Sequence, residues 1–258
     1  MKKILIVALS LACIICAGCV QINFDLTITD KGKVIRRWRF MGTTAFSQQI
    51  EEIKTKNEKQ IPNVKVERVA DGDLYGYEFT AEYADIKSFA ESPSEIYKPN
   101  AGKNKGVTSR EGWFFDEYDF DFWVKNPPAN IPIGVTINEA MFSEVVYDNV
   151  INLPYAAESH NADSVSDGGK VLRWNLSPIL IYGGEKYMNV RFKIWHKDKL
   201  AMTAAAELLL LMATIFFAVK ARAEDLEASG QDLRFKRNVF LGLFLTLGLI
   251  SAYMIFKP

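Results

Sequence analysis

Strict alternation of apolar and polar residues opens the central region of the chain. Over residues 20–29 every second position is apolar, and the positions between carry Gln, Asn, Asp and Thr. This period of two is typical of a strand with one buried face. The turn residues Asp30, Lys31 and Gly32 follow, and the apolar positions over 34–41 predict the returning strand of a hairpin.

Further strand patterns and one helix pattern follow along the middle of the chain. Thr44 can cap a helix that extends to about Gln60, with apolar residues on one face. Residues 98–110 are rich in Lys, Asn and Gly and predict a loop. Strands are predicted over 64–69 and 74–83, joined by a turn, then over 118–124, and near 133–138, 142–153, 170–176 and 186–195. The predicted fold class is α+β, a mostly antiparallel sandwich or barrel-like domain with one or two helices.

Two long apolar stretches close the chain. Residues 201–219 contain one charge and residues 239–256 contain none. Each stretch can cross a hydrocarbon core of about 30 Å as a helix. The segment between them carries five basic residues, whereas two directly precede the first stretch: Lys220, Arg222, Arg234, Lys236 and Arg237 against Lys197 and Lys199. A basic excess marks the cytoplasmic side, so the preceding domain and the C-terminus are predicted to lie outside.

The N-terminus has the order of a bacterial signal peptide. Lys2 and Lys3 precede the almost wholly apolar residues 4–15, and the small residues Ala17 and Gly18 precede Cys19. Small residues directly before a cysteine resemble the lipobox of bacterial lipoproteins, which implies that Cys19 receives a diacylglyceryl group with acyl chains such as palmitate. The alternative is a plain secretory signal that is cleaved nearby. Because all three cysteines lie at or before residue 19, disulfides and cysteine metal sites are excluded for the exported domain.

These patterns predict a linear organisation with two attachments to one membrane. Helical spans reside in the cytoplasmic membrane, so the acyl chains of Cys19 are expected in its outer leaflet, with the domain on the outer face. The predicted parts are a lipoprotein signal peptide at 1–18, an extracytoplasmic β-rich domain at 19–199, a transmembrane helix at 200–219, a cytoplasmic loop at 220–237 and a second transmembrane helix at 238–256.

Composition narrows the function classes. Lys and Arg number 31 and Asp and Glu number 31, and this balance argues against a nucleic-acid partner. With only two histidines, serine–histidine catalysis and histidine zinc sites are disfavoured. The acidic residues of 116–121 are interpreted as the solvated face of a strand, and the segment 161–169 as a turn in preference to a calcium loop. We therefore predict no enzyme activity, no catalytic residue, no metal and no cofactor.

Aromatic residues are dense over 113–123, where seven occur within eleven positions. Core packing is one explanation, and an apolar cavity or a membrane-contacting edge is the other. The alternation slips between Phe115 and Tyr118, so at least one of Trp113, Phe115 and Trp123 is expected to face away from the main core. These three residues are the candidate ligand-binding side chains.

The order of motifs resembles the LppM-domain family of bacterial lipoproteins over about residues 19–219. The lipobox cysteine leads directly into the strand at 20–28 and a Gly turn. Later come Asn152-Leu153-Pro154, Asn161-Ala162-Asp163, Asp167-Gly168-Gly169 and Leu172-Arg173-Trp174-Asn175-Leu176, followed by a membrane helix. The resemblance implies a barrel-like β domain similar to lipid-binding modules, with no known chemistry and no catalytic residues. The second apolar helix at 239–256 departs from the simplest family layout.

Two functional hypotheses remain. The first is a non-enzymatic domain that binds membrane lipid or another amphiphile at the outer face of the cytoplasmic membrane. The alternative is an interaction or scaffold subunit of an envelope complex without a ligand cavity, with an envelope protein partner reached through the transmembrane hairpin. An apolar cavity favours the first hypothesis, and a filled core with an exposed apolar patch favours the second.

Overall fold

A computed structural model describes residues 20–61, 63–92, 102, 104–126, 145–223 and 229–256. The chain forms two compact units. The first comprises residues up to Ser109 together with Tyr118–Ile194, and the second comprises Arg110–Glu117 with Trp195–Pro258. The signal peptide and Cys19 lie outside the described residues, as does the strand expected near 133–138.

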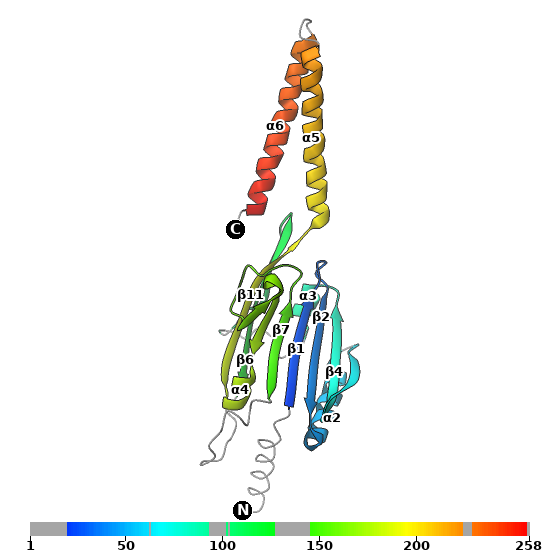
Figure 1. Ribbon diagram of the computed structural model, residues 1–258, viewed down its shortest axis with the longest axis vertical. Helices are drawn as coiled ribbons and strands as arrows, with labels where there is room; N and C mark the ends of the chain where they lie inside the picture. The colour runs from blue at the N-terminus through cyan, green and yellow to red at the C-terminus, as the bar shows by residue number, and fades with distance from the viewer. Residues whose placement is uncertain are drawn as a thin grey trace, which may run out of the picture. The chain divides into compact units, whose positions relative to one another are not determined.

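A seven-stranded sheet is the centre of the first unit (Figure 1). Its strand order is β3-β4-β2-β1-β7-β10-β9. Neighbouring strands pair antiparallel except β1 and β7, which are parallel. The strands are β1 (Val20–Ile28), β2 (Val34–Gly42), β3 (Lys65–Asp71), β4 (Leu74–Tyr83), β7 (Val146–Asn152), β9 (Ser164–Ser166) and β10 (Val171–Asn175).

A four-stranded sheet has the order β5-β6-β11-β8. Its strands are β5 (Gly106–Arg110), β6 (Phe115–Asn126), β8 (Ser159–His160) and β11 (Gly184–Trp195). Short helices connect the strands of the first unit: the 3₁₀ turn η1 (Thr44–Phe46), α2 (Ser47–Gln60), α3 (Ile86–Ala90), the 3₁₀ turn η3 (Asp167–Gly169) and α4 (Ser177–Tyr182). The α+β fold class with mostly antiparallel strands is confirmed.

The core lies between the two sheets and is made of large apolar side chains. Leu26, Phe79 and Trp174 from the seven-stranded sheet have an exposed fraction of 0%, as do Phe120 and Phe192 from the four-stranded sheet. The rings interlock, since Phe120 and Phe192 meet edge to face with centroids 5.1 Å apart. Burial of such aromatic side chains is the main stabilisation of a domain without disulfides.

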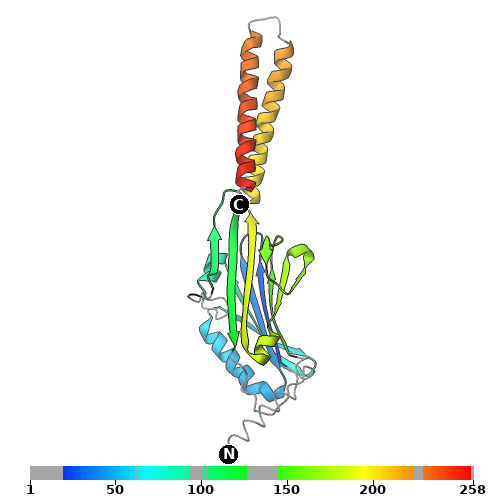
Figure 2. The ribbon, with the colours of Figure 1, turned by 90° about the vertical axis from the view of Figure 1, so that its left-hand side faces the viewer.

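One face of the seven-stranded sheet lacks a covering helix among the described residues. Helices α2 and α3 both lie behind the sheet in the view of Figure 1, and Figure 2 shows them on the same side. Ile50 of α2 and both Ile86 and Phe89 of α3 are buried there. The opposite face carries the polar half of the alternation and is directed toward the viewer in Figure 1.

Most predicted elements of the first unit agree with the structure. Both hairpins are present in the expected positions, and the helix predicted from Thr44 begins with one 3₁₀ turn before α2. The loop predicted over 98–110 is wrong at its end, because Gly106–Arg110 forms the strand β5 at the edge of the smaller sheet. A short edge strand with little apolar content has no local signal that distinguishes it from a loop.

The second unit contains two long helices, α5 (Lys197–Ala223) and α6 (Ser229–Phe256). Phe217 and Phe240 stack with centroids 5.4 Å apart, and Ala221 and Leu233 are buried where the helices meet. Most other apolar side chains of both helices are exposed. Segments Lys197–Arg222 and Gln231–Phe256 are long and apolar enough to cross a membrane.

Candidate binding surface

The uncovered face of the seven-stranded sheet forms a continuous polar surface because directly paired residues point to the same side. Two adjacent rows of paired residues cross the strands. One row contains Glu67, Glu78, Arg39, Asn23, Asp148 and Asn175, and the next contains Lys65, Thr80, Arg37, Asp25, Val150, Arg173 and Ser164. We call these two rows the polar sheet face. A rigid sheet therefore holds charged side chains from six strands at fixed spacing.

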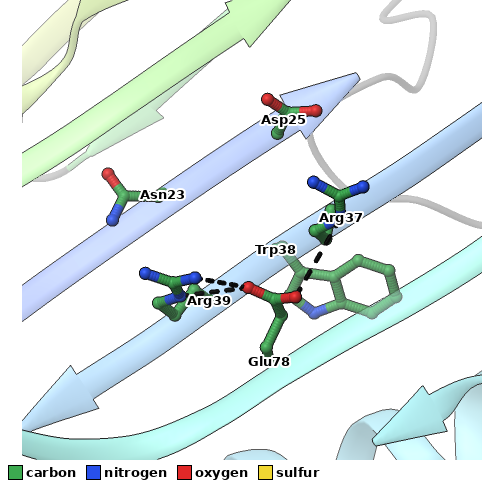
Figure 3. A pocket seen from close by; sticks show the side chains of 6 residues that line it. All are labelled: Asn23, Asp25, Arg37, Trp38, Arg39 and Glu78. Carbon is green, nitrogen blue, oxygen red and sulfur yellow. Dashed lines mark hydrogen bonds and ion pairs between the residues drawn. The ribbon is translucent and has the colours of Figure 1, made fainter. Parts of the chain in front are cut away.

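Glu78 is the centre of an ionic cluster on this face (Figure 3). Its Oε2 accepts hydrogen bonds from Nε of Arg39 at 3.1 Å and from Nη2 at 2.6 Å. Nε of Arg37 lies 4.0 Å from Oε1 of the same carboxylate. Two guanidinium groups thus share one carboxylate, and their side chains remain 47% and 40% exposed against 17% for Glu78.

A depression of about 180 Å³ lies beside this cluster, lined by Asn23, Asp25, Arg37, Trp38, Arg39 and Glu78. Asp25 is held by neutral donors: its carboxylate accepts from Oγ1 of Thr27 at 3.1 Å and from Nδ2 of Asn152 at 3.0 Å. The depression therefore has a basic cluster and a separate acidic group on two neighbouring strands. It offers donors and acceptors to a polar ligand, beside the apolar surface that Trp38 and the side-chain stems contribute.

Asp148 and Arg173 form a second ion pair on the polar sheet face. Nη2 of Arg173 donates to Oδ2 of Asp148, and this hydrogen bond raises the pKa of the Arg173 guanidinium further. The Asp148 side chain is 6% exposed, whereas that of Arg173 is 55% exposed. A depression of about 430 Å³ lies here, with Asp148, Asp163, Arg173, Asn175 and Ser177 among its lining residues. The buried carboxylate thus fixes an arginine that remains open to a partner.

The polar sheet face presents paired ions on a fixed sheet. The polar sheet face carries no histidine or cysteine that could act as a base or nucleophile. Among the described residues no group of three or more His, Cys, Asp or Glu side chains could hold a metal ion. Paired arginines and carboxylates on a fixed sheet are suited to binding charged or polar groups.

The three aromatic residues proposed from the sequence occupy different environments. Trp113 and Phe115 belong to the second unit and Trp123 to the first. Trp113 is 52% exposed, with Nζ of Lys199 5.1 Å from its ring centroid. Phe115 is buried and packs edge to face on Trp195, with centroids 5.1 Å apart. A ligand-binding role of these residues stays a prediction.

Trp123 lies on the outer side of β6. Its Nε1 donates to Oε2 of Glu185 at 3.3 Å, and its ring lies 6.4 Å from that of Tyr187. The core cluster contains Phe120, Phe122 and Val124 from this strand but not Trp123. The expectation that at least one of the three aromatic residues faces away from the main core is confirmed.

Sequence reasoning did not identify the polar sheet face as a site. The polar positions of β1 were visible as the second half of the alternation, and this was the available signal. Their partners Arg39, Glu78, Asp148 and Arg173 could be placed beside them only with the strand order and register.

Comparison with known proteins gives little further identification. No protein-family model matches the chain, and no curated protein sequence matches it. Among solved structures, the NMR structure of the folded domain of LppM from Mycobacterium tuberculosis matches with 13% identity and a TM-score of 0.39, covering 70% of this chain and 93% of that one. This likeness does not establish membership of the LppM-domain family, and function is therefore inferred from the chain's own residues.

Proposed function

We propose that this protein is a membrane-anchored, extracytoplasmic interaction subunit that recognises an envelope protein through its polar sheet face. The observation that carries this proposal is the array of charged side chains on an uncovered face of a sheet whose other face is the closed core. Because the strands fix these side chains, binding requires little further ordering of the domain. The apolar helices α5 and α6 and the lipobox-like Cys19 support membrane anchoring.

The charge pattern favours a protein as the partner. The polar sheet face contains four basic and four acidic residues: Lys65, Arg37, Arg39 and Arg173 against Glu67, Glu78, Asp25 and Asp148. Four minus four leaves no net charge, so a uniformly anionic surface or a polyanion has no long-range attraction to it. Alternating signs at fixed spacing are matched by another surface of mixed charge.

Binding of a lipid or amphiphile inside the domain has less support in the described residues. Such a site is expected to be an apolar cavity. The side chains that point inward between the sheets have exposed fractions at or near 0%. The depressions beside Glu78 and Arg173 have charged groups among their lining residues. Lipid mass spectrometry on the purified protein tests this hypothesis, because a stoichiometric co-purifying lipid in the domain would restore it.

Photo-crosslinking in cells tests the proposed function. A photoreactive amino acid at Asn23 is expected to capture a defined protein, because Asn23 lies between the two ionic clusters. The same probe at Lys56, which is exposed on α2, is the positional control. The double substitution R37E/R39E is expected to lower the yield of the Asn23 adduct at least about tenfold, because close interfacial charge pairs contribute about 1.5 kcal/mol or more each.

A charge reversal elsewhere in the domain tests whether the effect of R37E/R39E is specific to the polar sheet face. K56E/K59E alters two basic residues on α2, away from the polar sheet face, and is expected to leave the Asn23 adduct unchanged. An adduct at Lys56 in place of Asn23, or an Asn23 adduct that R37E/R39E does not weaken, would contradict the proposal.

A further inference from the structure

A groove between the two long helices combines basic and apolar side chains. It has a volume of about 470 Å³ and lies near the end of the hairpin where α5 leads into α6. Its lining residues are Ile215, Ala218, Val219, Ala221 and Arg222 of α5 with Arg234 and Arg237 of α6. Three guanidinium groups from two helices therefore surround one end of a depression whose remaining wall is apolar.

Helix packing fixes this groove. Phe217 and Phe240 stack at an interplanar angle of 13°, and Ala221 and Leu233 are 3% and 7% exposed at the contact. Arg234 and Arg237 are three residues apart, so they share a face of α6. The contact that joins the helices thus sets the backbone positions from which the arginines extend.

Two arginines of the groove have no acidic partner among the described residues. Asp232 pairs with Lys236 at 2.6 Å. Arg237 donates to Oδ1 of Asn238 at 3.1 and 2.8 Å, and this partner is a neutral amide. Among the described residues Arg222 has no ion-pair partner. An anion is the group that fits beside Arg222 and Arg237.

Depth in the membrane identifies the kind of anion. The apolar residues 201–219 of α5 extend about 28 Å at 1.5 Å per residue, which is close to the thickness of the hydrocarbon core. Arg222 lies three residues after this stretch, and Arg237 lies two residues before the apolar stretch of α6. The guanidinium groups then lie at the level of lipid headgroups, while Ile215 and Val219 lie at the level of acyl chains.

We propose that this groove binds one anionic phospholipid, with its phosphate headgroup between Arg222 and Arg237 and an acyl chain along Ile215 and Val219. The basic end of the groove then contacts the charged part of the lipid, and the apolar wall contacts its hydrocarbon part. A soluble phosphate would use the arginines alone and would make no contact with the apolar wall. This site lies in the second unit and is independent of the partner proposed for the polar sheet face.

Native mass spectrometry of the full-length protein in mild detergent tests the site. The protein is incubated with equimolar phosphatidylglycerol and phosphatidylcholine, and the retained lipids are counted. The wild type is expected to retain one phosphatidylglycerol in preference to phosphatidylcholine. R222Q/R237Q is expected to lower this preference at least about tenfold, because a direct hydrogen bond between charged groups contributes about tenfold or more.

K220Q/K236Q is the matched control because it removes the same charge from the same helix ends. It is expected to change the preference by less than about twofold, since these lysines do not line the groove. R222K/R237K keeps the charge but lacks the planar fork and is expected to give an intermediate loss. This conservative variant also provides a readout if the glutamine variant does not insert.

Three outcomes would overturn the proposal. One is equal loss in the arginine and lysine variants, which would show diffuse surface attraction. Another is an unchanged preference in R222Q/R237Q. The third is displacement of phosphatidylglycerol by excess inorganic phosphate, which would identify a site for a soluble anion.

Discussion

Asn161 connects the two sheets of the first unit through a single side-chain amide. Its Oδ1 accepts from Nε1 of Trp174 at 2.9 Å and from the backbone N of Asn189 at 2.8 Å. Its Nδ2 donates to the carbonyl of Tyr187 at 3.0 Å. Trp174 belongs to β10 of the larger sheet and is fully buried, whereas Tyr187 and Asn189 belong to β11 of the smaller sheet.

Asp163 makes a similar connection two residues later. Its carboxylate accepts from the backbone N of Asn175 at 2.8 Å and from Nζ of Lys186 at 2.7 Å. The segment 161–169, interpreted from its sequence as a turn, contains the strand β9 and the 3₁₀ turn η3. Its polar residues Asn161 and Asp163 therefore bind other parts of the fold.

Replacement of Asn161 by Ala is expected to destabilise the domain by about 1–3 kcal/mol, because the buried indole N–H of Trp174 loses its acceptor. Urea unfolding followed by tryptophan fluorescence measures the loss. S166A in the exposed strand β9 is the control and is expected to stay within about 0.5 kcal/mol of wild type. Equal stability of N161A and S166A would show that Asn161 does not hold the sheets together.

At the scale of elements, local sequence patterns were sufficient to predict the pairing of two strands that are close in sequence. The hairpin of β1 and β2 combines strict alternation with a turn at Gly32, whose φ is +78°, and the register follows from these two facts. The parallel pairing of β1 with β7 has no comparable signal, because Asn23 and Asp148 are separated by most of the domain. Five of the thirteen residues of the polar sheet face, those on β7, β10 and β9, join it through this pairing.

The continuous apolar stretches of α5 and α6 predict that these helices exist, and the basic residues that flank them predict their orientation. A membrane-impermeant maleimide tests the orientation, because the mature chain is predicted to have only an acylated cysteine as background. S229C at the start of α6 is expected to remain unlabelled in intact cells and to react after permeabilisation. S159C in β8 is exposed and is expected to react in intact cells.

These two positions serve as controls for each other. If S159C does not react before permeabilisation, the reagent has not reached the domain. The labelling is then repeated on spheroplasts in place of intact cells. Labelling of S229C under conditions that leave a cytoplasmic marker unlabelled would place the segment 220–237 outside and would contradict the predicted topology.

At the scale of the whole molecule, the two predicted attachment points leave the first unit at opposite ends of its strands. A Cβ placed on Gly32, in the turn after β1, would lie 3.9 Å from Cδ1 of Ile194, so the end of β11 lies beside that turn. Val20 pairs with Gly42 at the other end of β1. Nine residues of strand separate these ends by about 26 Å.

This separation constrains how the domain meets a membrane. Cys19 directly precedes Val20, and α5 begins three residues after Ile194. If the acyl chains of Cys19 and helix α5 are inserted in the same membrane, both ends of β1 must lie near its surface. The strands then run along the membrane, and they do not stand upright on it.

Energy transfer to acceptor-labelled lipids measures this orientation in proteoliposomes of the full-length protein. Donor labels at Thr44, beside the Val20 end, and at Lys31, in the turn near Ile194, are expected to report similar distances from the bilayer when Cys19 is acylated. When a leader without a lipobox replaces residues 1–19, the Thr44 label alone is expected to move away, by up to about 26 Å, because only that end loses its attachment. Mass spectrometry of the mature N-terminus establishes whether acylation occurred. An acylated protein whose Thr44 label lies a strand length farther from the bilayer than its Lys31 label would show that the two attachments do not share one membrane surface.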